Sequence, residues 1–131
     1  DLPYPVAVWH FARGTAYART GRLDAARREL AALERTLADP RLPAAKVKNI
    51  NLAERLARIA ALTLRAEILL ADDRAAQAVP LLQQAVTIED ALDYDEPHLW
   101  LAPTRHALGA ALLKARRYAD EAGRYARDHA K

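Results

Sequence analysis

The chain has 131 residues, a formal net charge of +3, and neither cysteine nor methionine. Disulfides, zinc–thiolate sites and thiol catalysis are therefore excluded, and the near-balance of charge gives no reason to expect nucleic-acid binding. No run approaches the roughly 20 apolar residues of a membrane span. The hydrophobic content of 52%, mostly alanine and leucine, predicts a single all-helical domain over residues 1–131. Because methionine is absent, we expect the chain to be a piece of a longer protein.

The first pair of predicted helices covers residues 5–38. One helix runs from about residue 5 to residue 20 and ends at Gly21. The second runs from about residue 23 to residue 38, with apolar residues at helical spacing, and ends at Asp39 and Pro40. The short turn between the two helices predicts an antiparallel hairpin.

The second pair covers residues 44–92. Its first helix is expected over about 44–71, with a break or later start left open by Asn49 and Asn51. Asp72 and Asp73 are expected to be the cap and first-turn acids of the next helix, over about 74–92. Pro80 inside that segment predicts a late helix start or a kink.

The third pair covers residues 98–130. It follows the loop sequence DYDEP, Asp93 to Pro97, and comprises predicted helices over about 99–115 and 118–130. The sequence thus predicts six helices in three antiparallel hairpins.

An internal repeat connects the three hairpins. Shifted by 95 residues, ARGTAYARTGR lies over ALGAALLKARR, and a shift of 52 residues places Arg22 and Ala26 over identical residues at Arg74 and Ala78. The two shifts place small residues, Gly14, Ala66 and Gly109, at the same point of each hairpin. Since glycine inside a helix costs about 1 kcal/mol relative to alanine, we expect Gly14 to allow close helix packing.

These residues resemble the tetratricopeptide repeat. That pattern has a small residue where its two helices cross, a large residue three positions later, a glycine at the turn and an alanine in the second helix. The matching positions are Gly14, Tyr17, Gly21, Ala26, Ala66, Ala78, Gly109 and Tyr118. The resemblance implies a right-handed stack of three repeats, although these are 52 and 43 residues apart where the family norm is 34.

Two longer runs resemble the C-terminal part of a group of long bacterial tetratricopeptide-repeat proteins. They are LPYPVAVWHFARGTAYARTGRLDAA and EDALDYDEPHLWLAPTRHALGAALLKARRYADEA. That group implies a fold and no particular activity.

Catalytic chemistry has little support in the sequence. There is no serine for a Ser/His/Asp triad, and the four glycines never cluster into a phosphate-binding loop. We therefore expect no enzyme and no cofactor. His10 is expected to be a packed, hydrogen-bonded residue. A metal or small-ligand site around residues 93–97 stays open as an alternative, with candidate ligands His98, His106, Glu89 and Asp95.

The resemblance implies a concave groove lined by the first helix of each hairpin. The residues that match its lining positions are Phe11, Thr15, Arg19, Thr63, Glu67, His106 and Lys114. Arg19 and Lys114 are candidates to clamp a carboxylate of a bound peptide. The expected function is therefore a protein-interaction scaffold for a protein or peptide partner. Stacking or self-association of the hairpins is the remaining alternative.

Overall fold

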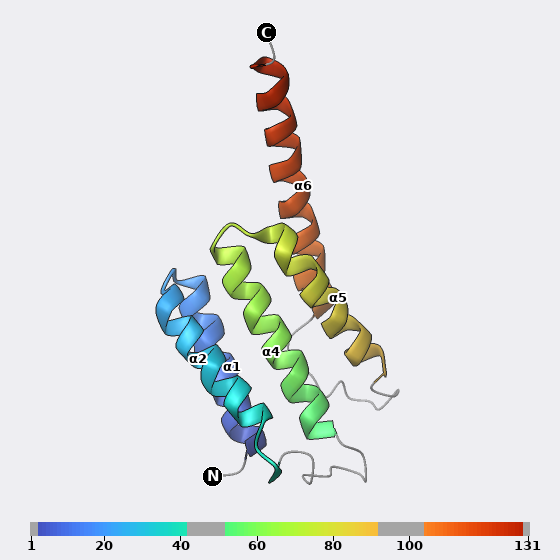
Figure 1. Ribbon diagram of the computed structural model, residues 1–131. Helices are drawn as coiled ribbons and strands as arrows, with labels where there is room; N and C mark the ends of the chain where they lie inside the picture. Colours follow the sequence, from blue (N-terminus) through green and yellow to red (C-terminus); the bar gives the residue numbers. More distant parts are fainter. Residues whose placement is uncertain (1–2, 42–51, 92–103, 130–131) are drawn as a thin grey trace.

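The computed structural model describes residues 3–41, 52–91 and 104–129, and these segments form an all-helical protein. The helices are α1 (Pro3–Arg19), α2 (Leu23–Leu37), α4 (Leu52–Ala71), α5 (Ala75–Ala91) and α6 (Thr104–Asp128), as Figure 1 shows. No strand occurs in the three described segments, so the all-α prediction is confirmed. None of the described helices has the length and apolarity needed to cross a membrane.

Helices α1 and α2 form one hairpin, and α4 and α5 form a second (Figure 1). Both turns use the same hydrogen bonds, 52 residues apart. In the first, the backbone N–H of Arg22 donates to the carbonyl of Tyr17 at 2.8 Å, and Gly21 has a φ of 79°. In the second, the N–H of Arg74 donates to the carbonyl of Leu69 at 2.8 Å. This pattern is the Schellman motif, whose penultimate residue adopts a left-handed conformation.

Asp73 takes the left-handed position in the second turn, with a φ of 58°. The prediction that Asp72 and Asp73 cap α5 and supply its first-turn acids is therefore wrong. Asp73 ends α4, and α5 begins at Ala75 without an acidic residue in its first turn. Aspartate tolerates this conformation better than most residues because its short polar side chain hydrogen-bonds locally.

Helix α4 is the centre of the molecule and packs against α1, α2, α5 and α6. The largest fully buried apolar side chains are Leu33 of α2, Ile59 and Leu64 of α4, and Leu82 of α5. Most of the other buried positions are alanines, which let the helix axes approach closely.

Gly14 lies at a close helix contact, as its place in the repeat predicts. A Cβ added there would lie 2.6 Å from Cδ2 of Leu64 and 3.2 Å from Cβ of Glu29. Ala66, which aligns with Gly14 in the second hairpin, is fully buried with Ala78 and Leu82 of α5. The small residues of the first two hairpins therefore have the packing role that was predicted for them.

The third predicted hairpin does not form. Helix α6 runs without interruption from Thr104 to Asp128, through the turn expected near residues 116–117. The residue aligned with Gly21 and Asp73 is Arg116. A left-handed conformation is unfavourable for arginine, whereas helix is favourable, so the chain continues as a helix. Five described helices replace the six that were predicted.

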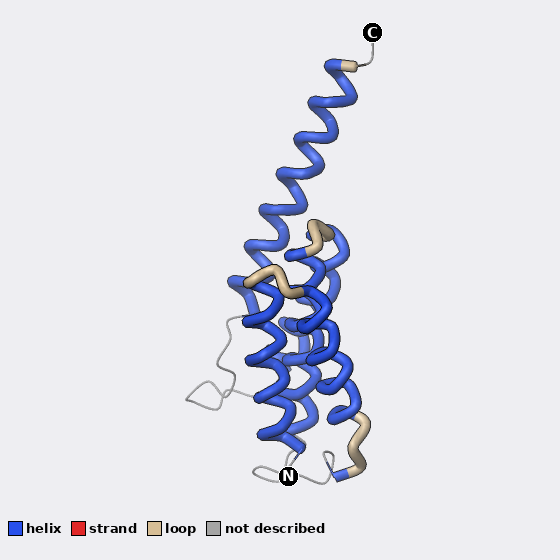
Figure 2. Tube along the Cα trace, turned by 90° about the vertical axis from the view of Figure 1, so that its left-hand side faces the viewer, coloured by secondary structure: helices blue, strands red, loops and turns tan. Residues whose placement is uncertain are grey.

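The outer half of α6 extends away from the bundle, with no other described helix beside it in either view (Figures 1 and 2). Gly109, near the start of α6, is also exposed, and an added Cβ would meet nothing within 4 Å. Its predicted role at a helix crossing is not realised within the described residues.

Two further predictions concern where helices begin. Residues 44–51 lie outside the described part, and α4 is described from Leu52. Pro80 lies within α5, five residues after its first residue, so the late start offered for that helix is wrong.

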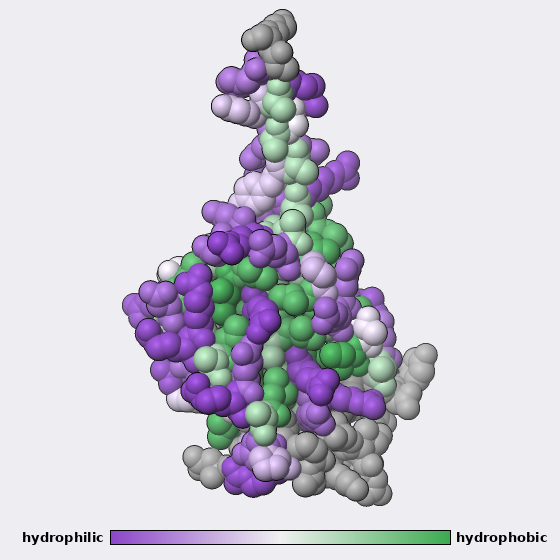
Figure 3. Space-filling model, viewed as in Figure 1, coloured by the Kyte–Doolittle hydropathy of each residue, from purple (hydrophilic) through white to green (hydrophobic). Residues whose placement is uncertain are grey.

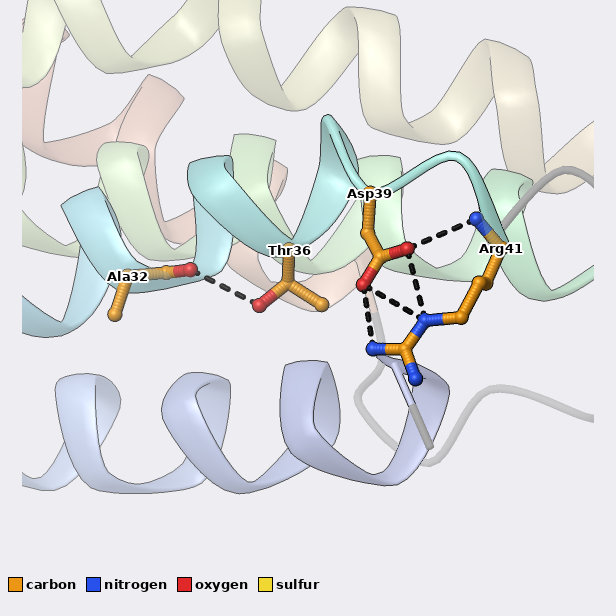
Figure 4. Close-up of polar contacts among 4 residues, drawn as sticks. All are labelled: Ala32, Thr36, Asp39 and Arg41. Atoms are coloured by element: carbon orange, nitrogen blue, oxygen red, sulfur yellow. Dashed lines mark hydrogen bonds and ion pairs between the residues drawn. The ribbon is translucent and has the colours of Figure 1, made fainter. Parts of the chain in front are cut away.

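The end of α2 agrees with the prediction that Asp39 and Pro40 stop it. The carboxylate of Asp39 accepts hydrogen bonds from the backbone N–H of Arg41 at 2.9 Å and from its Nη2 at 2.8 Å (Figure 4). Inside the last turns, the hydroxyl of Thr36 donates to the carbonyl of Ala32 at 3.0 Å. Hydrogen bonds from the Arg41 side chain, then from its backbone N–H, lower the pKa of Asp39.

Candidate functional site

A cleft lies between α2, α4 and α5, with a volume of about 380 Å³. Figure 3 shows apolar surface among hydrophilic residues on the face that these helices form. The cleft residues are Glu34, Leu37, Glu54, Arg58, Ala61, Leu62, Arg65, Gln84 and Ile88. Its volume lies within the range of about 300–1,000 Å³ that is usual for ligand-binding sites.

The cleft has an apolar floor and a charged rim. Leu37, Ala61, Leu62 and Ile88 form the apolar part, and each is partly buried against the core. On the rim, Nη2 of Arg58 donates to Oε1 of Glu54 at 3.1 Å. Arg65 is ion-paired with Glu34 across the gap between α4 and α2. A bound segment would therefore meet an apolar surface flanked by charges of both signs.

The residues predicted to line the concave groove do not line this cleft. Phe11 packs against the core cluster of α1, α2 and α4. Thr63 is buried, and its hydroxyl donates to the carbonyl of Ile59 at 2.7 Å. The hydroxyl oxygen of Thr15 is buried and has no hydrogen-bond partner among the described residues. The helix faces on which these three residues lie are used for packing.

The two cations predicted to clamp a carboxylate already have partners within the chain. Nη2 of Arg19 donates to Oε1 of Glu67 at 3.0 Å. Nζ of Lys114 donates to the carbonyl of Leu70 at 2.8 Å and lies 3.6 Å from Oδ1 of Asp73. The structure thus brings Arg19 and Glu67 together, two of the predicted groove residues, and assigns Lys114 to the attachment of α6 to the end of α4.

The alternative metal site falls largely outside the described residues. His98 and Asp95 lie outside them. His106 is exposed, and Glu89 accepts a hydrogen bond from the hydroxyl of Thr104. Across residues 3–41, 52–91 and 104–129, no group of three or more histidine and acidic side chains is arranged to hold a metal ion.

A polar network links α1 to α2 around Glu29, a buried carboxylate. Nδ1 of His10 lies 2.6 Å from Oε2 of Glu29, and Nε of Arg13 lies 3.4 Å from Oε1. The prediction of a packed, hydrogen-bonded His10 is confirmed. Arg13 also stacks over the ring of Trp9, 4.3 Å from its centroid, and donates to the hydroxyl of Tyr17 at 3.0 Å.

The Tyr17 hydrogen bond raises the pKa of Arg13, burial opposes this, and the charge of Glu29 makes a smaller contribution that also raises it. Glu29 was not predicted from the sequence. It lies three residues after Ala26 and four before Leu33, on the buried face of α2. This helical spacing is the feature of the sequence that predicts a buried position for Glu29. The network joins the two helices of the first hairpin and leaves Trp9 53% exposed.

In comparisons with known proteins, no family model, curated protein or solved structure matches the chain.

Proposed function

We propose that the chain is a tetratricopeptide-like helical scaffold that binds a segment of a partner protein and performs no catalysis of its own. The repeat assignment is supported by the two identical Schellman turns 52 residues apart. It is also supported by the order of contacts, in which α4 packs on both helices of the preceding hairpin and α6 packs on α5 and α4. The small residues at Gly14 and Ala66 agree with the same pattern.

The observation that carries the binding proposal is the cleft between α2, α4 and α5. Its apolar floor suits an apolar side chain of a partner segment, and its rim offers Arg58 and Arg65 to an acidic neighbour in that segment. Both arginines are more than half exposed, so a partner carboxylate reaches them without unfolding a helix. The occupant we infer is therefore a short segment with an apolar anchor next to an acidic residue.

The concave groove is the other surface of the same scaffold. Binding of a carboxylate by Arg19 and Lys114 would replace the contacts of these residues with Glu67 and Leu70. The rim arginines of the cleft also have partners, Glu54 and Glu34, so what favours the cleft is its apolar floor.

A peptide-display selection with the purified chain tests this proposal. Gln84 is exposed and lines the cleft, and Gln84→Trp should fill it without disturbing the core. Gln77→Trp is the matched control, because Gln77 is exposed on the same helix and does not line the cleft. We expect selected peptides to lose at least tenfold in affinity for the Gln84→Trp variant and to keep it for the control.

The groove is tested with the same peptides and the charge reversals Arg19→Glu and Lys114→Glu. Affinity lost in these variants and retained in Gln84→Trp would move the binding site to the concave groove. If the selection yields no two peptides that compete for binding to the folded chain, the scaffold proposal is overturned.

A further inference from the structure

Helix α6 contains two glycines that the fold does not explain. Glycine destabilises a helix interior relative to alanine, and at Gly14 the close approach of Leu64 explains its presence. At Gly109 an added Cβ would meet nothing within 4 Å. At Gly123 the nearest contact of an added Cβ would be Nη1 of Arg127 at 3.6 Å, the end of a flexible side chain. Within the described residues, neither position requires a small side chain.

The two glycines lie on one face of α6, where Gly109 is exposed and Gly123 is partly buried. Positions separated alternately by four and three residues share a helix face. We call this face the α6 seam, and its residues are Gly109, Leu113, Arg116, Asp120, Gly123 and Arg127. Leu113 is 67% exposed, the largest exposed fraction among the exposed large hydrophobic residues of the described chain.

The opposite face of α6 is the one that attaches to the bundle. Ala111 is fully buried there, and the hydroxyl of Tyr118 donates to Oδ1 of Asp73 at 2.7 Å. On the seam, by contrast, Arg116 and Asp120 are exposed and form no ion pair in the described part of the chain. The seam therefore points away from the rest of the molecule, with both an apolar side chain and unpaired charges.

The seam is complementary to itself when two helices run antiparallel. If Arg116 of one copy lies opposite Asp120 of the other, symmetry makes the same pair a second time. In this register Leu113 lies opposite Gly123, and Arg127 lies opposite Gly109. Each glycine then faces a long side chain, so the missing Cβ atoms provide the space that the opposing helix needs.

We propose that α6 pairs antiparallel with α6 of a second copy of this chain, about a twofold axis midway between residues 116 and 120. A second copy fits the seam because Arg116 of one copy meets Asp120 of the other, and each glycine meets a long side chain. The outer half of α6 stands clear of the other described helices (Figures 1 and 2), so a second copy reaches it without displacing a packed element. This association uses a different surface from the cleft and does not depend on peptide binding.

A charge-exchange experiment tests the pairing. Arg116→Asp places acidic residues at both 116 and 120, and Asp120→Arg places basic residues at both positions. Neither variant should self-associate, whereas a mixture of the two should form a heterodimer and the double variant should form a homodimer. Sedimentation velocity over roughly a hundredfold range of concentration measures all four cases. Both substitutions are at exposed sites, and circular dichroism checks that the fold is retained.

The absence of cysteine from the chain allows a second test of the register. Copies carrying Leu113→Cys are mixed with copies carrying Gly123→Cys under mild oxidation. The proposal predicts a cross-link between unlike copies and little between like copies, since two residues 113 would lie about 15 Å apart along the pair.

A wild-type chain that stays monomeric at the highest concentration would overturn the proposal. So would a dimer that forms equally well in both single charge variants, or cross-linking mainly between like copies. A wild-type dimer, restored by the mixture of charge variants and cross-linked between residues 113 and 123, is the result expected.

Discussion

Gly14 in α1 and Gly109 in α6 occupy the same position of an internal repeat and have opposite surroundings. Gly14 is buried where Leu64 and Glu29 leave no space for a Cβ, whereas Gly109 is exposed with open space beside it. The difference arises seven residues further along the chain. Gly21 makes a turn there with a φ of 79°, and α2 folds back on α1, whereas Arg116 continues the helix. One residue's backbone preference thus decides whether the neighbouring face is covered.

The largest expected effect contrasts a leucine beside Gly14 with one beside Gly109. Leu64→Ala should destabilise the protein by about 2–5 kcal/mol, because Leu64 is fully buried and its removal leaves a cavity. Leu113→Ala, at a position 67% exposed, should change the stability of the monomer by less than about 0.5 kcal/mol. Urea unfolding at a concentration where the chain is monomeric measures both. Equal losses would contradict the contrast between the two regions.

Alanine substitutions at Gly14 and Gly109 should change the free energy of unfolding in opposite directions. Gly14→Ala should lower the free energy of unfolding by about 1–2 kcal/mol, because the new Cβ overlaps Leu64 by more than the helix preference of alanine offsets. Gly109→Ala should raise it by about 1 kcal/mol, because alanine favours the helix and meets no neighbour within 4 Å. Thermal and urea unfolding of the two variants check this prediction. If Gly14→Ala stabilised the protein, the side chain of Leu64 would be able to move away from the new Cβ at little cost in free energy.

A third change tests the packing of α1 directly. The hydroxyl oxygen of Thr15 is buried, and no group in the described segments forms a hydrogen bond with it. Thr15→Val, which keeps the shape of the side chain, should therefore stabilise the protein by about 1 kcal/mol. The measurement is again urea unfolding, with Thr87→Val as the control at an exposed threonine on α5. A loss of stability in Thr15→Val alone would indicate that this hydroxyl has an ordered water or another polar partner.

The smallest effect concerns the attachment of α6. The hydrogen bond to Asp73, followed by burial and the charge of Asp73, raises the pKa of Tyr118 above its ordinary value of 10.0. Because the pKa is raised on folding, this contribution is present below pH 10 and is lost as the pH rises through the raised value.

The tyrosines of the wild type and of Tyr118→Phe are titrated by ultraviolet absorbance. The variant should lack one of the tyrosines that titrate late in the wild type. Asp73→Asn, which keeps a residue tolerant of the left-handed conformation, should return the pKa of Tyr118 toward its ordinary value. A Tyr118 that titrates at the ordinary value in the wild type would show that the bond to Asp73 does not persist in solution.

Much of the first hairpin could be predicted from the sequence, because a glycine marks its turn and a proline marks its end. The turn at Gly21, the close packing at Gly14 and the end of α2 near Asp39 all follow from local backbone chemistry. The absence of the third hairpin could not be predicted in the same way. The repeat alignment counts matching residues and gives no extra weight to the one residue that must adopt a left-handed conformation in the turn. Comparing Gly21, Asp73 and Arg116 as turn residues would have identified the continuous α6.

The candidate site was harder to predict than the fold. The cleft is assembled from three helices, and its rim pair between Arg65 and Glu34 joins residues 31 positions apart. The resemblance to the tetratricopeptide repeat predicted a clamp by Arg19 and Lys114. The intramolecular partners of these residues, Glu67 and the carbonyl of Leu70, depend on how the hairpins stack. Contacts of this kind require the tertiary structure.

The most direct measurement of the central claim is the distance across α6. With no native cysteine, His106→Cys and Asp128→Cys can carry spin labels at two exposed sites, diluted with unlabelled chain so that only distances within one copy are recorded. A continuous helix predicts a single distance of about 33 Å between the two backbone sites. A main population near 10 Å, as for two packed antiparallel helices, would show that residues 118–128 fold back and would contradict the account.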